Sequence, residues 1–88
     1  MREIVAVVGS VTSASRLKKA LEKKGCINSE ISHTPSAISA GGCSYSVYLS
    51  ENCIPVLSKT VDEYKIALKG IYKKYIKEGK EFYYDLSG

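Results

Sequence analysis

The chain has 88 residues, of which 44% are hydrophobic and 25% are charged, and its formal net charge is +4. This length allows one compact domain and excludes two, and the composition is that of an ordinary globular protein. No apolar run approaches the roughly 18 residues of a membrane-spanning helix, and the first residues lack a signal-peptide pattern. We therefore expect a cytoplasmic protein that does not contact a membrane.

The first half of the chain predicts a strand, a helix and two further strands. Ile4–Val8 form an unbroken apolar run, which is typical of a buried strand. Ser10 follows as an N-cap, and apolar residues then recur at helical spacing until Gly25, a residue type that commonly ends a helix. Alternating residues over 27–33 and 45–49 predict the two further strands, and the proline that follows ends the first of them.

The second half of the chain is less regular. Ser50 or Asn52 is expected to cap a helix that turns Ile54, Leu57 and Val61 inward, although Pro55 falls in its opening turns. Residues 64–77 fit the spacing of a strand and also that of a helix, and periodicity alone does not choose between them.

The tail predicts a hairpin around Gly79, with the aromatic residues Phe82–Tyr84 on its return arm. The resulting order, βαββαβ, predicts a ferredoxin-like α+β fold, in which an antiparallel sheet carries both helices on one face. We divide the chain into a ferredoxin-like domain over residues 1–73 and a C-terminal hairpin extension over residues 74–88. In this topology the third strand pairs beside the first, so the turn after the first strand and the loop after the second lie at the same end of the sheet.

A cysteine on that loop is the most specific feature of the sequence. Cys43 follows two glycines, just before the third strand, so a partner could reach its thiol. The nearby helix N-terminus would stabilise the thiolate, and the glycines would let backbone amides approach the sulfur. The simpler interpretation is a small residue that closes a tight turn. The residues expected to surround the thiol are Gly9, Ser10, Thr12, His33, Thr34, Gly41, Gly42 and Ser44.

The other cysteines predict no chemistry. Cys26, Cys43 and Cys53 are an odd number at unequal spacing, which is not typical of a secreted disulfide framework and favours a reducing compartment. We expect Cys26 and Cys53 to pack as structural residues. A metal site made from these cysteines and His33 is disfavoured, because no close Cys-x-x-Cys pair is present. We expect no metal and no cofactor.

The positive charge comes from scattered lysines, in residues 18–24 and 65–80. Such a surface could attract RNA or an acidic partner, and Lys18 or Lys19 could help to dock the latter. A solvated lysine-rich face is the simpler interpretation, because no aromatic RNA-binding motif accompanies the charge. Nucleic acid is therefore not the expected partner.

Three stretches of the sequence carry a family resemblance. They are the strand, Gly-Ser turn and helix of residues 4–14, the Thr-Pro-x-x-Ile-Ser segment of residues 34–39 that leads to Cys43, and the weaker Gly-Ile-Tyr of residues 70–72. Together they resemble the selenium/sulfur carrier protein-like family, over about residues 3–73. The Gly-Ile-Tyr match favours a strand in this part of the chain.

The resemblance implies a carrier more than an enzyme. Cys43 would hold sulfur or selenium as a persulfide or selenopersulfide, between a donor such as a cysteine desulfurase and an acceptor enzyme. Members of the family often have an arginine after the proline, where this chain has Ser36, and a Cys-Gly order, where this chain has Gly42-Cys43-Ser44. The missing arginine removes a source of positive charge beside the thiol.

Two other classes of function remain open from the sequence. The chain could be a ferredoxin-like regulatory or small-ligand-binding module without thiol chemistry, a class in which homodimers are common. It could also be an RNA-binding accessory domain that uses its lysines and tyrosines. Thiol reactivity and salt-dependent RNA binding, respectively, distinguish these two classes from a carrier.

Overall fold

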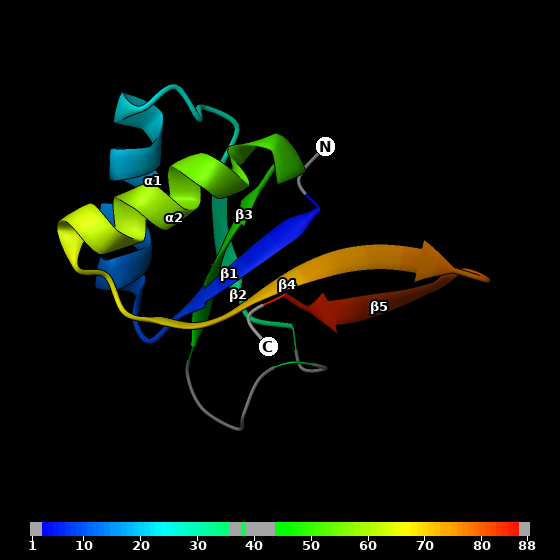
Figure 1. Ribbon diagram of the computed structural model, residues 1–88. Coiled ribbons are helices and arrows are strands. Elements are labelled where there is room, and N and C mark those ends of the chain that lie inside the picture. The colour runs from blue at the N-terminus through cyan, green and yellow to red at the C-terminus, as the bar shows by residue number, and fades with distance from the viewer. Residues whose placement is uncertain (1–2, 36–37, 39–43, 87–88) are drawn as a thin grey trace.

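The computed structural model describes residues 3–35, 38 and 44–86, which form an α+β fold (Figure 1). The elements are β1 (Ile4–Val8), α1 (Val11–Lys23), β2 (Glu30–His33), β3 (Tyr45–Leu49), the 3₁₀ helix η1 (Glu51–Cys53), α2 (Ile54–Tyr64), β4 (Leu68–Lys77) and β5 (Lys80–Asp85). Among these residues no helix is long and apolar enough to cross a membrane.

The described strands form one antiparallel sheet in the order β2-β3-β1-β4-β5, and α1 and α2 lie together on one of its faces (Figure 1). The first four strands in this order have the arrangement of a ferredoxin-like fold, and the β4–β5 hairpin adds one more strand at the edge. The predicted fold class is confirmed, as is the pairing of the third strand beside the first.

β1 is buried on both faces of the sheet. Its Ile4, Ala6 and Val8 belong to the core that α1 and α2 cover. Val5 and Val7 point to the other face, and both are also buried. Tyr48 of β3 and Tyr72 of β4 are the register partners of Val5 on its two sides, so the helix-free face is shielded by tyrosine rings rather than by a third layer.

The ends of α1 follow the sequence signals. The Ser10 side chain accepts a hydrogen bond of 3.2 Å from the backbone N–H of Ser13, which is the contact of an N-cap. At the other end Gly25 has a φ of 93°, a left-handed conformation that glycine adopts without a steric cost. Both predictions are confirmed.

α2 begins later than its predicted caps suggest, because a 3₁₀ turn precedes it. Ser50 is the N-cap of η1, and its side chain makes no capping hydrogen bond. Pro55 falls in the first turn of α2, where its missing N–H would have had no intrahelical acceptor, so the residue is tolerated there. Lys65, with a φ of 54°, ends the helix.

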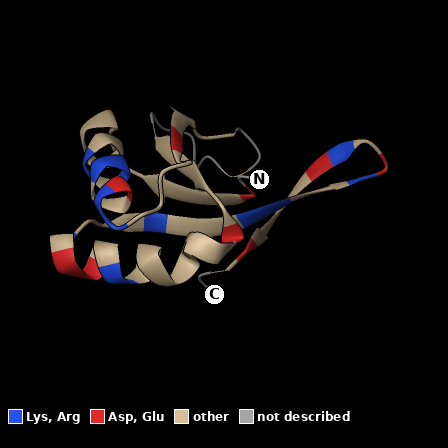
Figure 2. Cartoon of the chain, turned by 90° about the horizontal axis from the view of Figure 1, so that it is seen from above, with Lys and Arg blue, Asp and Glu red and all other residues tan. Residues whose placement is uncertain are grey.

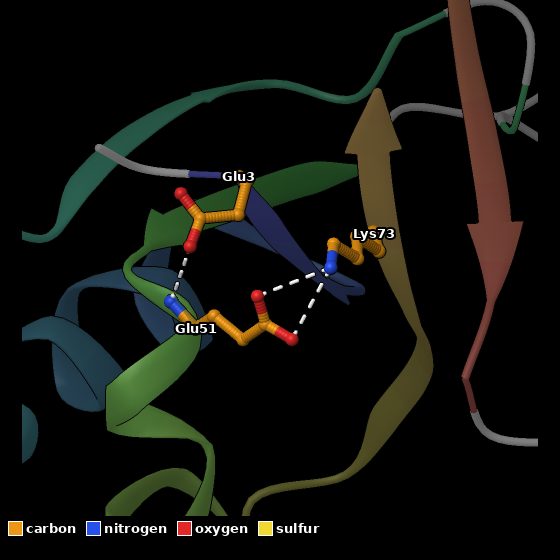
Figure 3. Close-up of polar contacts among 3 residues, drawn as sticks. All are labelled: Glu3, Glu51 and Lys73. Carbon is orange, nitrogen blue, oxygen red and sulfur yellow. Dashed lines mark hydrogen bonds and ion pairs between the residues drawn. The ribbon is translucent and has the colours of Figure 1, made fainter.

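The carboxylate of Glu3, the residue that precedes β1, caps the 3₁₀ turn (Figure 3). Glu3 Oε1 accepts a hydrogen bond of 2.8 Å from the backbone N–H of Glu51, and Lys73 Nζ of β4 lies 3.1 Å from Glu51 Oε1. The hydrogen bond from Glu51 lowers the pKa of the Glu3 carboxyl below its usual value. These contacts connect β1, η1 and β4 at the end of the sheet where β1 starts.

The spacing of residues 64–77 allows a helix or a strand, and the structure contains part of each. Tyr64 completes α2, Ile66 is buried in the connection, and the strand runs from 68 to 77. The predicted hairpin is confirmed, with Glu78 and Gly79 at φ values of 53° and 77° in its two-residue turn. Because β4 is continuous across residue 73, the sheet extends past the proposed domain limit, and the division of the chain there stays a prediction.

Cys26 and Cys53, which we expected only to pack as structural residues, form a disulfide that the cysteine spacing did not predict. Cys26 is held after α1 by its backbone N–H, which donates to Leu21 O at 2.9 Å, and Cys53 ends η1 beside the start of α2. β2 is shorter than predicted, since it begins at Glu30 rather than at Ile27, and Ile27 is 69% exposed. The sequence contains three cysteines, and this odd number did not suggest that two of them pair while Cys43 remains outside the disulfide.

Reduction of this disulfide is expected to lower the free energy of unfolding by roughly 3–4 kcal/mol, because it closes a loop of 27 residues. Urea unfolding with and without a phosphine reductant measures the change. The Cys26→Ala/Cys53→Ala variant is the control, and its midpoint should not respond to the reductant. An unchanged wild-type midpoint, with three titratable thiols before reduction, would contradict the pairing.

Candidate functional site

The ends of four strands meet at one end of the sheet. In the strand register His33 pairs with Tyr45, Tyr45 pairs with Val8, and Val8 pairs with Leu68. The turn from β1 into α1, the start of β3, the end of β2 and the start of β4 therefore share this end. We call it the β1–α1 end of the sheet.

Gly41, Gly42 and Cys43 lie outside the described residues, so the expected approach of Cys43 to the start of α1 stays a prediction. Ser44, the next residue in the chain, is described and is buried. Its carbonyl oxygen accepts a hydrogen bond of 3.3 Å from the backbone N–H of Thr34. This bond continues the pairing of β2 and β3 by one step and fixes the point where the loop joins β3.

The start of α1 supplies backbone N–H groups at the same end. Gly9 and Ser10 form the turn, and Thr12 lies exposed in the first helical turn. The Ser10 side chain caps one N–H, that of Ser13, and the first intrahelical bond runs from Ala14 N–H to Ser10 O at 3.1 Å. The N–H groups of Val11 and Thr12 come too early in the helix to have a helical carbonyl as acceptor. The helix dipole adds a partial positive charge to this position.

His33 and Thr34 lie on opposite faces, because successive residues of a strand alternate. His33 shares the helix-covered face with Tyr45, and the two rings lie 4.9 Å apart between centroids. Thr34 Oγ1 and Ser46 Oγ share a hydrogen bond of 2.9 Å on the helix-free face, since Ser46 is the register partner of Val7. The two predicted site residues thus contribute to different surfaces.

A β-bulge brings a lysine to this end that the sequence analysis did not select. Val7 pairs with Gly70 and Val8 pairs with Leu68, so Lys69 is an extra residue in β4. The bulge keeps Leu68 on the core face and directs the Lys69 side chain toward Gly9. Lys69 Cε lies 3.5 Å from the position that a Cβ on Gly9 would occupy. The lysine side chain therefore passes directly over the β1–α1 turn.

Several other lysines of this chain form ion pairs with carboxylates, and Lys69 differs from them in this respect. In the described part of the chain no carboxylate pairs with Lys69, which is exposed. Both basic and acidic residues lie on the two helices and on the hairpin (Figure 2). The pairs include Lys18–Glu22, Lys24–Glu63, Lys73–Glu51 and Lys74–Glu81. Lys18, one of the two lysines expected to help dock an acidic partner, is thus paired with Glu22 of its own helix at 2.9 Å.

A separate recess lies on the helix-free face, toward the opposite end of the sheet. Burial raises the pKa of Tyr48, and the Tyr83 hydroxyl adds to this effect. A hydrogen bond to Glu81 raises the pKa of Lys74. The recess is lined by Glu3, Glu30, Ser32, Tyr48, Lys74, Tyr75 and Ile76. None of these residues belongs to the predicted thiol site.

The Cys26–Cys53 disulfide is remote from the β1–α1 end. Cys26 follows the C-terminus of α1, whereas Ser10 precedes its N-terminus, and a helix of 13 residues is about 20 Å long. Among the described residues no group of three or more His, Cys, Asp or Glu side chains could hold a metal ion.

The fold defines a small ferredoxin-like α+β protein. A family model described as "Putative Se/S carrier protein-like" matches residues 3–73, so the chain belongs to this family. The resemblance found in the sequence is confirmed at this level. Neither the curated proteins nor the solved structures compared with the chain gave a match.

The Thr34–Ser46 hydrogen bond is expected to couple the two hydroxyls energetically. Replacing Thr34 with Val leaves the buried Ser46 hydroxyl without this partner and should cost about 1–2 kcal/mol of unfolding free energy. Ser46→Ala should cost a similar amount, and the double variant should cost less than the sum of the two. A urea-unfolding double-mutant cycle measures this coupling. Strictly additive single effects would show that the hydroxyls do not bond.

Proposed function

We propose that this protein carries sulfur or selenium on Cys43, as a persulfide or selenopersulfide, between a donor enzyme and an acceptor enzyme. Membership of the Se/S carrier-like family supports the class of function. The observation that carries the proposal is the Lys69 bulge, which puts a cationic side chain over Gly9 at the end of the sheet where the Cys43 loop joins β3.

The chemistry needs a thiolate and no external oxidant. The Cys43 thiolate attacks the outer sulfur of a persulfide on the donor, the donor's S–S bond breaks, and a new S–S bond forms on Cys43. The donor cysteine leaves as a thiolate, and the acceptor later receives the outer sulfur in the same way. A cysteine desulfurase is the type of donor that supplies such a persulfide.

Lys69 provides the positive charge that Ser36 does not. A cation close to a thiol favours its ionised form, and a helix N-terminus acts in the same direction. The ammonium reaches the β1–α1 turn from β4 rather than from the loop itself. The proposed site therefore combines Cys43 with Gly41, Gly42 and Ser44 from the loop, Gly9, Ser10 and Thr12 from the turn, and Lys69 from the bulge, with His33 and Thr34 at its border.

Transfer requires Cys43 in its thiol form, which a reducing compartment such as the cytoplasm maintains. Cys26 of the Cys26–Cys53 disulfide is buried, with 4% of its surface exposed. This burial slows the attack of external thiols on the disulfide. The pairing also removes Cys26 and Cys53 as competing acceptors of sulfur.

Incubation with a cysteine desulfurase and cysteine, followed by intact mass under non-reducing conditions, tests the proposal. The wild-type chain should gain one sulfur atom, which a reductant removes, because Cys43 is the acceptor. The Cys43→Ser variant should gain none, and Cys26→Ala/Cys53→Ala should gain sulfur as the wild type does. A Cys43→Ser variant that still gained sulfur would refute the assignment.

The small-molecule-binding alternative has one observation in its favour, the recess around Tyr48 and Lys74. In that function the thiol would have no part, and the chain would gain no sulfur from the desulfurase in any variant. The same mass measurement therefore separates the two functions.

A further inference from the structure

We propose that the free edge of β5 pairs antiparallel with β5 of a second copy of this chain, with Phe82 facing Phe82 across a two-fold axis. This inference rests on the hairpin and does not depend on the carrier function. We propose a second copy as the partner of this edge because β5 is complementary to itself in one register. Both its outward backbone groups and its side chains support that register.

The backbone of β5 leaves one set of residues facing outward. Glu78 and Gly79 form a two-residue turn, so the flanking pair Lys77–Lys80 is hydrogen-bonded. Hydrogen-bonded pairs recur every second residue along β5, and Leu86 N donates to Ile71 O at 2.8 Å in the same register. The N–H and C=O groups of Glu81 and Tyr83 therefore point away from β4, toward the outer edge of β5.

An apolar surface lies beside this edge. Phe82 is 40% exposed and Tyr84 is 58% exposed, and both share the helix side of the sheet with Tyr75, which is 46% exposed. The rings of Tyr75 and Phe82 are stacked, with centroids 5.5 Å apart. The hairpin projects beyond α1 and α2 (Figure 1), so neither helix covers these rings.

A two-fold axis perpendicular to the sheet restricts the register to pairs of residues on the same face. Centring the pair on Phe82 sets Lys80 opposite Tyr84 and Glu81 opposite Tyr83, and it uses only residues of β5. Phe82 then forms a non-hydrogen-bonded pair with its copy, where strands approach most closely and aromatic pairs are favoured. Lys80 lies over a tyrosine ring, and a Tyr83 hydroxyl can donate to a carboxylate.

The neighbouring registers are less favourable. Centring the pair on Tyr83 sets Glu81 opposite Asp85 twice, and centring it on Glu81 sets two glutamates against each other, so each brings carboxylates together. Centring it on Tyr84 pairs Phe82 with Leu86, which lies past the end of β5. Charge disfavours the first two of these registers and the length of β5 disfavours the third, so the pairing of Phe82 with Phe82 is favoured.

Sedimentation equilibrium of the full chain tests the pairing. The wild type should be a monomer–dimer system with a dissociation constant in roughly the micromolar range, because a single edge contact is a small interface. Glu81→Pro removes an outward N–H from each copy and should weaken the dimer about tenfold or more relative to Glu81→Ala, which keeps that N–H and loses only the carboxylate. Both variants lose the ion pair with Lys74, so Ala is the matched control.

A wild type that stays monomeric at all concentrations, or equal dissociation constants for the Pro and Ala variants, would overturn the proposal.

Crosslinking gives a second readout that does not depend on folding of the proline variant. In a Cys43→Ser background, Phe82→Cys should oxidise to a covalent dimer, and Tyr83→Cys should not. Crosslinking through position 83 in place of 82 would overturn the proposed register.

Discussion

The antiparallel pairing of β1 on both of its sides is the constraint on which the rest of the structure depends. Because β3 and β4 both run opposite to β1, the end of β1 meets the starts of both neighbours. Burial on two faces makes this strand the least adjustable part of the sheet. The turn into α1, the junction of the Cys43 loop with β3 and the bulge in β4 are consequently held at one place.

The bulge resolves a conflict between packing and charge. A regular ladder would have placed Lys69 opposite Val8 on the core face, where a lysine cannot be buried at an acceptable cost. The extra residue returns Leu68 to the core beside Val8 and directs the lysine over Gly9. A feature that packing requires thus supplies the charge that the proposed thiol site needs.

Much of the fold could be predicted from local signals, and the parts that failed depended on contacts far apart in the sequence. The apolar run of β1, the Ser10 cap and Gly25 are local, and the structure agrees with each of them. The pairing of Cys26 with Cys53 needs the ends of two helices to meet, which spacing does not reveal. Likewise Lys69 is one of many lysines until the register of β4 against β1 is known.

The candidate site was predicted in part for the same reason. Topology placed Ser10 and Thr34 at one end of the sheet, and this arrangement is present. The alternation of His33 and Thr34 between opposite faces follows from the strand period and could have been stated from the sequence. The role of Cys43 remains a proposal, because it rests on family membership and on the groups that surround the loop's junction with β3.

The pKa of the Cys43 thiol, measured from the pH dependence of its alkylation rate, tests the central claim most directly. Because Cys26 and Cys53 are paired in a disulfide, alkylation of the unreduced protein reports on Cys43. We predict a wild-type pKa clearly below the free value of about 8.5, a rise of roughly half a unit or more in Lys69→Gln, and a value close to wild type in Lys69→Arg. A wild-type pKa near the free value that is the same in all three proteins would contradict the claim.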